Sequence, residues 1–377
     1  MRVFVIAGEA SGDKLGAALM AGLTGLTDVT FDGVGGPMMA EQGLVSRFPM
    51  DELSVMGLAE ILPKYRALKA RVRQMAQAVL DSKPDVLITI DSPDFCLCVA
   101  KLVKAGSDIR CVHYVAPTVW AWRPKRAAKM ARHIDQVLAL FPFEPPLMQA
   151  AGMRCDFVGH PVVTDPIAST GEAAAWEGDG PLVMLLPGSR RGEIARLLPR
   201  FGQAAALIAR ARPDVRFALP TTANVYDGVV AGVAEWDVPV QILTADQRAE
   251  KRGLFASADV ALAASGTVSL ELAANDTPMV IAYDMAWLSR IIIGWMLLVD
   301  TVTLVNLVSD SRVIPEFVGK DCVAAQIAAA VLRVLDDPTA QHTAMAVTMD
   351  RLGRGGDAPG VRAARAVLDG IAVARRG

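Results

Sequence analysis

The sequence predicts an α/β protein built from two doubly wound, Rossmann-like domains that face each other across a cleft. Its length of 377 residues suits two domains of ordinary size better than one core. Short runs of Val, Ile and Leu without polar alternation recur along the chain, as in parallel strands that are buried on both faces. Segments with helical spacing separate these runs, so strands and helices alternate as such a fold requires.

Six runs of the strand type lie in the first half of the chain. Helices are expected between several of them, over 13–23 and 65–82, because apolar residues recur there at helical spacing. The expected strands cover 3–7, 31–34, 86–91, 111–115, 137–141 and 155–158.

The second half repeats this pattern, with helices expected at 193–212 and 268–275 and strands at 182–186, 216–219, 238–243, 260–264 and 279–282. A stretch rich in Pro, Gly, Ser and acidic residues indicates a linker at about 165–181. We therefore expect an N-terminal domain over 1–165 and a C-terminal domain over 182–345. The remaining segment, 346–377, should be helical after a glycine hinge and pack either on its own N-terminal domain or on a partner chain.

Composition excludes several classes of protein. With 38 basic and 40 acidic residues the formal charge is -2, so no basic field indicates a nucleic-acid partner. The apolar stretch at 3–7 is too short for the core of a signal peptide, and the block at 291–299 has about half the ~20 residues of a spanning helix. Export and a membrane span are not expected. Five cysteines without CxxC spacing indicate buried thiols in a reducing cytosol.

Polar residues follow two strands of the first half. In "AGEASGDKLG", Gly8 permits a tight turn, Ser11 is expected to cap the next helix and Asp13 lies in its first turn. In "LITIDSPDF", Asp91 ends an apolar run, and a desolvated carboxylate there could act as a general base. A plain helix cap and a turn cap are the respective alternatives. Asp13 and Asp94 are weaker candidates for the base.

Two segments of the second half suit an anionic ligand. A strand ending at "LLPGSRRGEI" is followed by two guanidinium groups, and a strand ending at "AASGTVSLEL" turns into a helix whose free N–H groups favour an anion. Together they suit a diphosphate, with a surface charge as the alternative for either arginine. The residues expected to bind a donor that carries this diphosphate are Gly188, Ser189, Arg190, Arg191, Ser265, Gly266 and Thr267, with Glu271 accepting hydrogen bonds from a sugar diol.

No metal or other cofactor is expected. The chain contains neither an Asp-x-Asp triplet nor an HExxH motif, which favours a diphosphate neutralised by arginines and helix dipoles. His113 and His160 follow apolar runs, and packing is the favoured role for both.

Tryptophans interleave with cations or aliphatic residues in two stretches. Trp120 and Trp122 lie among arginines and lysines, and Trp287 and Trp295 flank an aliphatic run. The first stretch could contact an anionic lipid surface or bind a phosphate-bearing ligand, and the second could form the mouth of an apolar pocket or a membrane anchor. Burial of the tryptophans in the core is the alternative.

Taken together, "AGEASGD", "MGLAEIL", "PDVLITIDSPDF", "HYVAPTVWAWR", "FVGHP", "LLPGSRRGEI", "ASGTVSLE" and "NLVSDSRVIPE" resemble the lipid-A-disaccharide synthase family. They occur in order from residue 7 to residue 316 and as a set are highly specific. The resemblance implies a GT-B fold and a metal-independent, inverting hexosyltransferase of lipid A and lipopolysaccharide biosynthesis. It would transfer 2,3-diacylglucosamine from UDP to 2,3-diacylglucosamine 1-phosphate, giving a β-1,6 disaccharide 1-phosphate and UDP.

The resemblance also assigns roles and partners. Asp91 matches the family's essential aspartate, Ser11 and Asp13 its N-terminal loop, and Asn306 and Glu316 a late motif near the sugars. It implies a peripheral protein on the cytoplasmic face of the inner membrane and a homodimer with exchanged C-terminal segments. Two alternatives stay open. One is another GT-B enzyme acting on UDP-N-acetylglucosamine, either a 2-epimerase or a transferase with a soluble acceptor. The other is an inert nucleotide-sugar or lipid-binding protein.

Overall fold

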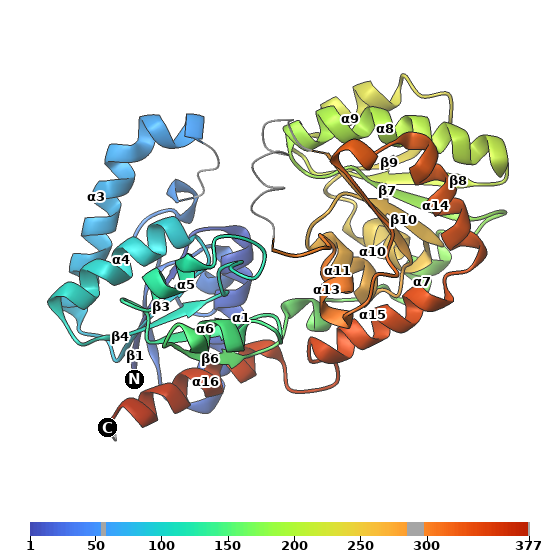
Figure 1. Ribbon diagram of the computed structural model, residues 1–377. Coiled ribbons are helices and arrows are strands. Elements are labelled where there is room, and N and C mark those ends of the chain that lie inside the picture. The colour runs from blue at the N-terminus through green and yellow to red at the C-terminus, as the bar shows by residue number, and fades with distance from the viewer. Residues whose placement is uncertain (54–57, 285–297, 376–377) are drawn as a thin grey trace. The chain divides into compact units, whose positions relative to one another are not determined.

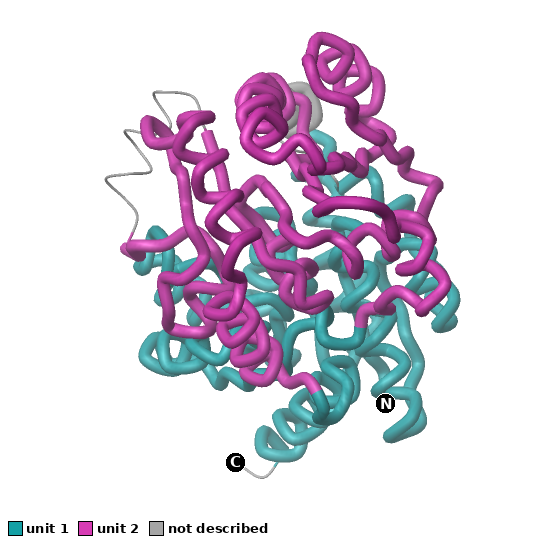
Figure 2. Tube along the Cα trace, turned by 90° about the vertical axis from the view of Figure 1, so that its right-hand side faces the viewer, with its two compact units in different colours: residues 1–164, 355–377 teal, residues 165–354 magenta. Residues whose placement is uncertain are grey.

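A computed structural model describes residues 1–53, 58–284 and 298–375. The chain forms two compact units, one of residues 1–164 with 355–377 and one of residues 165–354 (Figure 2). In the described residues each unit contains one parallel sheet of six strands with flanking helices (Figure 1). The predicted α/β class with two doubly wound sheets is confirmed.

The sheet of the first unit has the strand order β2-β1-β3-β4-β5-β6. Its strands are β1 (Arg2–Ala7), β2 (Thr30–Val34), β3 (Val86–Ile90), β4 (Arg110–Tyr114), β5 (Gln136–Ala139) and β6 (Arg154–Phe157). The helices are α1 (Ala10–Leu26), α2 (Pro37–Glu41), η1 (Met50–Glu52), α3 (Leu58–Ser82), α4 (Pro93–Gly106), α5 (Lys125–Met130), α6 (Pro145–Ala150), η2 (Pro161–Thr164) and α16 (Pro359–Ala374).

The sheet of the second unit has the order β12-β11-β10-β7-β8-β9, which is the Rossmann order. Its strands are β7 (Leu182–Leu186), β8 (Arg216–Pro220), β9 (Gln241–Leu243), β10 (Val260–Ala263), β11 (Met279–Tyr283) and β12 (Glu316–Val318). The helices are α7 (Thr170–Ala174), α8 (Arg191–Ala211), α9 (Tyr226–Val233), α10 (Arg248–Ser257), α11 (Val268–Ala274), α13 (Leu304–Ser309), η3 (Gly319–Asp321), α14 (Ala324–Asp336) and α15 (Thr339–Arg351).

Burial on both faces explains why the strands could be predicted. All residues of β3, β7 and β10 are buried, so no polar alternation interrupts their apolar runs. Every expected strand is present, with ends that differ by up to three residues. The edge strand β12 was not predicted, because its three residues are only partly buried and follow no apolar run.

Several local predictions were wrong. Helix α1 begins at Ala10, so Ser11 lies inside the first turn and does not cap the helix. The segment expected to be a linker contains α7, whose Ser169 and Glu172 form a capping box, and α7 packs against α10. Cys98 is exposed, whereas the other four cysteines are buried.

The C-terminal helix α16 packs against α1 within the first unit. The two backbones approach closely at glycines, because a Cβ at Gly22 would lie 2.6 Å from the carbonyl oxygen of Gly360. Gln136 on β5 also donates from Nε2 to the carbonyl oxygen of Ala366, at 2.8 Å. Within the described residues, no helix combines the length and the apolarity that crossing a bilayer requires.

His113 on β4 should make the stability of the fold depend on pH. Its side chain is buried, and Nδ1 lies 2.8 Å from Thr89 Oγ1. Burial lowers the pKa of His113 to about 4. Folding therefore favours the neutral ring. Its contribution to the free energy of unfolding is complete above the pKa of the unfolded state, about 6.5, and is lost as the pH falls toward 4.

We expect the free energy of unfolding to fall by roughly 2–3 kcal/mol between pH 6.5 and pH 4 through this residue. Urea denaturation of wild type and His113→Asn across this range measures it, since the variant should lose that part of the pH dependence. His342→Asn, at a partly exposed histidine on α15 that lies beside Asp276, serves as the control. An equal slope in all three proteins would contradict the prediction.

Candidate functional site

The predicted site residues follow the strands at which each sheet reverses its order. In the first unit β1 and β3 are neighbours, and their connections lead to β2 on one side and to β4 on the other. In the second unit the same reversal lies between β7 and β10. Ligands of doubly wound proteins bind outside the carboxyl ends of the strands at such a point. The loops that carry Asp13 and Asp91, and those that carry Arg190 and Thr267, occupy these positions.

Asp91 lies in a strained turn between β3 and α4. Asp91 and Ser92 both have left-handed backbone conformations, with φ of 52° and 40°. The N–H of Asp91 donates to the carbonyl oxygen of Tyr114 at 3.0 Å, and Pro93 begins the helix. Val115, after the neighbouring strand β4, has φ of 81°, which is unusual for a β-branched residue. Strained residues of this kind concentrate at functional sites.

Three aspartates near this edge differ in their partners. The carboxylate of Asp13 is buried and accepts the N–H groups of Gly36, Met38 and Met39 at 2.9–3.0 Å, so it holds the start of α2. The exposed Asp94 forms an ion pair with Arg126.

Asp91 is partly buried, and within the described residues no group donates a hydrogen bond to its carboxylate. Asp94 is also open to solvent, so what distinguishes Asp91 is a partly buried carboxylate without a partner in the described residues.

The loops after β1 and β3 approach closely. A Cβ at Gly8 would lie 2.5 Å from Ser92 Oγ, so a larger residue there would require the Ser92 side chain to move. Ser92 Oγ is buried and has no partner in the described part of the chain. Sequence reasoning did not single out Ser92 or Val115, because their backbone conformations leave no sequence signal.

In the second unit, Gly188 and Glu193 shape the arginine loop. Gly188 has φ of 109°, and a Cβ there would lie 2.5 Å from Glu193 Oε2. That oxygen accepts the N–H groups of Ser189 and Arg190 at 3.2 and 3.3 Å, and Glu193 also pairs with the Arg190 side chain. Arg191 begins α8 and is exposed, and the Arg190 side chain is 66% exposed. The loop thus joins two N–H groups and two guanidinium groups at a helix start, a set that suits a phosphate.

A residue that sequence reasoning missed supports this loop. Asn224 follows β8 and donates from Nδ2 to the carbonyl oxygen of Ser189 at 2.9 Å. Its position after a strand of the same sheet is a signal that could have found it, since β8 neighbours β7.

The loop after β10 lies beside the strand that precedes the arginine loop. The N–H of Ala264 donates to the carbonyl oxygen of Leu186 at 2.8 Å. Ser265 donates to the carbonyl oxygen of Val302 at 2.9 Å, Gly266 has φ of 157°, and Thr267 caps α11 through its backbone only. Glu271 lies in the first turn of α11 and is partly buried. The hydroxyl of Thr267 is thus exposed at a helix start.

Asn306 and Glu316 contact each other and hold the segment beside Ser265. The buried Asn306 donates from Nδ2 to Glu316 Oε1 at 3.1 Å and bonds both backbone groups of Ile314 at 3.0 Å. The Glu316 carboxylate accepts the N–H groups of Val302 and Thr303 at 3.1 and 2.9 Å, and the hydroxyl of Thr301. These side chains are therefore engaged within the protein, where they fix the carbonyl group that receives the Ser265 hydroxyl.

Of the four tryptophans predicted to contact lipid, Trp120 and Trp122 are described, and they have different surroundings. Trp120 lies edge-on to Phe141 and Phe143 and donates to Glu144 Oε1 at 3.3 Å. Burial raises the pKa of Glu144 to about 7. The guanidinium group of Arg123 lies over the Trp122 ring, and its central carbon is 4.3 Å from the ring centroid. Trp287 and Trp295 lie outside the described residues.

In the described part of the chain, His113 and His160 have structural roles and no cluster of metal ligands is present. His160 is buried, lies 5.5 Å from the ring of Phe141 and accepts the N–H of Val162 at 3.2 Å. His113 and His160 thus pack in the core, as predicted. No group of three or more His, Cys, Asp or Glu side chains among the described residues could hold a metal ion.

Two doubly wound sheets, each with polar loops at its point of reversal, are typical of α/β proteins that bind nucleotides. The sequence model described as lipid-A-disaccharide synthetase matches residues 3–357. The lipid-A-disaccharide synthase of Ruegeria pomeroyi is 59% identical over 381 residues, covering 98% of this chain and 95% of that protein. That of Rhodospirillum centenum is 45% identical, covering 98% and 94%. The chain belongs to the lipid-A-disaccharide synthetase family, as predicted.

Solved structures show the same fold. The UDP-N-acetylglucosamine 2-epimerase of Neisseria meningitidis bound to UDP-GlcNAc matches with a TM-score of 0.67 and 10% identity, covering 99% of this chain and 100% of that chain. A putative epimerase of Listeria monocytogenes matches with a TM-score of 0.64 and 13% identity, covering 100% and 96%. At these identities the likeness concerns the fold, and it confirms the predicted GT-B architecture.

The contacts of Asn306 and Glu316 predict a coupled effect on stability. Glu316→Ala should lower the free energy of unfolding by about 1–3 kcal/mol, because it leaves buried donors without an acceptor. Combined with Asn306→Ala, the loss should fall short of the sum of the single losses by at least about 0.5 kcal/mol. Urea denaturation measures all three variants. Asp300→Asn, in an exposed ion pair on the same segment, should leave stability nearly unchanged, and strict additivity of the two alanine variants would contradict the contact.

Proposed function

We propose that this chain transfers 2,3-diacylglucosamine from its UDP donor to the 6-hydroxyl of 2,3-diacylglucosamine 1-phosphate, with inversion and without a metal ion. The products are the β-1,6-linked disaccharide 1-phosphate and UDP. The observation that carries the proposal is Asp91, which lies in a strained turn at the reversal point of the first sheet and whose carboxylate has no hydrogen-bond partner among the described residues.

Membership of the family makes the chain a glycosyltransferase of lipid A biosynthesis, and this prediction is confirmed. The alternative of a UDP-N-acetylglucosamine 2-epimerase draws on the fold of the solved structures, which are at most 13% identical. The relatives that are far more similar over the whole chain carry the synthase name. An inert binding protein would have no use for the strained turn at Asp91.

In the proposed step, Asp91 accepts the proton of the acceptor hydroxyl as its oxygen attacks the anomeric carbon of the donor. The bond between that carbon and the diphosphate oxygen breaks, and its electron pair leaves with UDP. Asp13 contributes by fixing the backbone of residues 36–39 beside the same loop. Ser11, exposed in the first turn of α1, would contact a substrate through its hydroxyl.

The departing diphosphate gains negative charge, which Arg190, Arg191 and the N–H groups of residues 188–190 would stabilise. Gly266 and Thr267 would bind it from the neighbouring loop, and Glu271 would accept hydrogen bonds from the ribose hydroxyls. Because Glu193 already engages Arg190 and two of the N–H groups, the diphosphate must compete with this carboxylate for them. Asn306 and Glu316 support the sugar region by holding residues 301–303.

Partners and location follow from the acylated substrates. We include in the proposal a peripheral position on the cytoplasmic face of the inner membrane and a homodimer. Trp122, stacked with Arg123 and close in sequence to the cations of α5, suits contact with an anionic lipid surface. Trp120 would support that surface from its aromatic cluster.

Asp91→Asn should lower kcat by about 100- to 10,000-fold, the usual contribution of a positioned general base, with little change in the Kd of UDP. Disaccharide formation from both acylated substrates, in detergent micelles with EDTA, measures kcat. Asp94→Asn is the matched control, since Asp94 lies three residues away and is exposed, and it should retain activity. If UDP affinity fell in parallel with kcat, Asp91 would be a structural cap and the proposed base would be wrong.

Arg190→Ala should weaken UDP binding by roughly 1.5–3 kcal/mol, the scale of a charge-assisted hydrogen bond. Isothermal titration with UDP measures the change. Arg210→Ala, at the other end of α8 and exposed, should bind UDP as the wild type does. Unchanged affinity in Arg190→Ala would remove this side chain from the diphosphate site.

A further inference from the structure

The first unit contains an arginine close to the proposed base that the proposed step does not use. Arg126 lies in the first turn of α5, and its Nη2 is 3.3 Å from Oδ1 of Asp94 in the first turn of α4 (Figure 1). Asp94 follows Asp91 by three residues, which span at most about 11 Å of chain. The Arg126 guanidinium therefore lies near the turn that carries Asp91.

The electrostatic effect of Arg126 on His113 also places it at the carboxyl edge of the sheet. Burial, and after it the positive charge of Arg126, lowers the pKa of His113 to about 4. His113 is followed by Tyr114, the last residue of β4, whose carbonyl oxygen accepts the N–H of Asp91. Arg126 is thus near both the start of α4 and the carboxyl end of β4, the two elements that position the proposed base.

Arg126 retains hydrogen-bond donors for a ligand. A guanidinium group has five N–H donors, and within the described residues the side chain of Arg126 makes one polar contact, the long ion pair with Asp94. The Asp94 side chain is fully exposed, whereas that of Arg126 is 29% exposed. Such an ion pair contributes little to stability, so a stronger anion can take the place of the carboxylate.

The sequence around Arg126 supplies no competing carboxylate. Residues 115–134 include five lysines and arginines and no Asp or Glu. The other four cations are exposed: Arg123, Lys125, Lys129 and Arg132. Exposed charges are strongly screened by salt and hydrated, whereas a partly buried guanidinium interacts more strongly with an anion. Arg126 is therefore the member of this segment that best suits a bound substrate, and the exposed cations suit the lipid surface.

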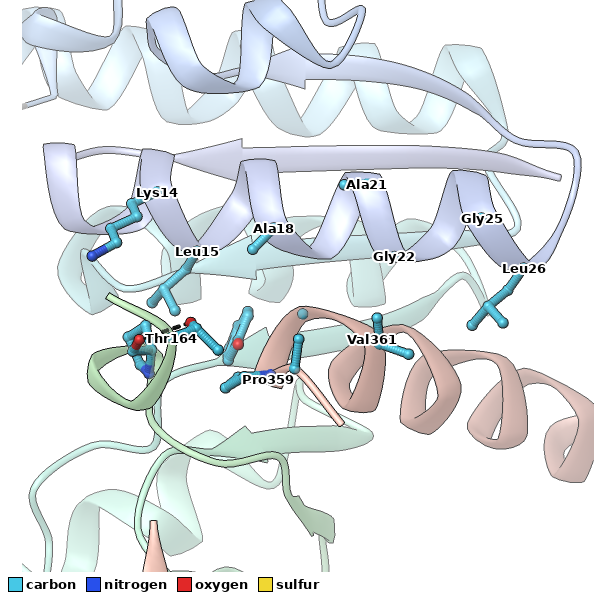
Figure 3. A pocket seen from close by; sticks show the side chains of 14 residues that line it. Lys14, Leu15, Ala18, Ala21, Gly22, Gly25, Leu26, Thr164, Pro359 and Val361 are labelled. Carbon is cyan, nitrogen blue, oxygen red and sulfur yellow. Dashed lines mark hydrogen bonds between the residues drawn. The ribbon is translucent and has the colours of Figure 1, made fainter. Parts of the chain in front are cut away.

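The apolar groove beside α1 has a less suitable cation. Among the described residues that line this groove, between α1 and the start of α16, Lys14 is the only charged one (Figure 3). Lys14 already has an interaction within the protein. In the same groove α16 meets α1 closely, at Gly22 and Gly360. Arg126, whose one partner is exposed, is better placed to bind an anion than Lys14.

A sugar 1-phosphate has the chemistry that Arg126 recognises. A phosphate monoester carries nearly two negative charges and three acceptor oxygens, which a guanidinium group binds through paired N–H groups. We propose that Arg126 binds the 1-phosphate of the acceptor and so selects a phosphorylated acceptor over a neutral one. This inference rests on the proposed function, which supplies a sugar phosphate whose 6-hydroxyl is held at Asp91.

Acceptor kinetics with and without the phosphate test the inference. Arg126→Met keeps the length and helix propensity of the side chain but removes its charge and N–H groups, so the protein should fold, which thermal unfolding verifies. The KM for 2,3-diacylglucosamine 1-phosphate should rise about 10- to 100-fold, the scale of a charge-assisted hydrogen bond, with kcat nearly unchanged. With 2,3-diacylglucosamine, which lacks the phosphate, wild type and Arg126→Met should have equal KM. Arg126→Lys keeps the charge and should recover part of the lost affinity.

Arg132→Met is the matched control, because it removes an exposed charge from the same segment. It should match wild type with both acceptors in neutral detergent micelles. Sedimentation with vesicles that contain phosphatidylglycerol measures lipid binding separately, and Arg126→Met should sediment as Arg132→Met does. A KM that rises equally for both acceptors in Arg126→Met, or a loss of vesicle binding without an effect on KM, would overturn the inference.

Direct binding separates this inference from the proposed reaction. Isothermal titration of the acceptor in the same micelles gives its Kd without turnover. If wild type binds the phosphorylated acceptor through Arg126 but forms no disaccharide, the proposed reaction alone is wrong. If disaccharide forms and Arg126→Met leaves the KM of the phosphorylated acceptor unchanged, the role of Arg126 alone is wrong.

Discussion

The reversal of strand order in each parallel sheet is the constraint on which the candidate sites depend. The connection from β1 leads to β2 on one side, whereas the connection from β3 leads to β4 on the other, and β7 and β10 repeat this arrangement in the second unit. Loops that leave neighbouring strands in opposite directions cannot pack against each other along their length, so their polar groups face a crevice. The strand order therefore determines where a ligand site can form, whichever side chains the loops carry.

The buried sheets also stabilise conformations that the local sequence disfavours. Left-handed Asp91 and Ser92 and the positive φ of Val115 each cost on the order of 1–3 kcal/mol. They follow β3 and β4, whose apolar residues are fully buried and whose register is fixed by parallel pairing. The buried, paired strands therefore fix where these turns begin. Ser92, in the left-handed conformation, occupies the N-cap position before Pro93, and its side chain makes no capping hydrogen bond to α4.

Much of the fold could be predicted from the sequence because burial on both faces leaves a simple signal. The strands of both sheets show it, and the points of chain reversal follow from their order. The edge strand β12 and the capped helix α7 lack it, since their positions depend on tertiary contacts. The site was predictable as a set of residues after strand ends. Their partners were not, because the N–H groups that occupy Asp13 and the αL conformation of Ser92 arise only in the folded chain.

The late motif illustrates how a residue can affect a site without reaching a ligand. Asn306 and Glu316 bond each other, and Glu316 takes up the N–H groups of residues 302 and 303. This fixes the carbonyl oxygen of Val302, which accepts the hydroxyl of Ser265, so the loop before α11 has one defined position. A diphosphate bound to preorganised N–H groups does not have to order them on binding. Loss of either side chain would therefore shift the backbone of residues 301–303 and, through it, the loop before α11. This explains how Asn306 and Glu316 can support the donor site although their own hydrogen bonds are all within the protein.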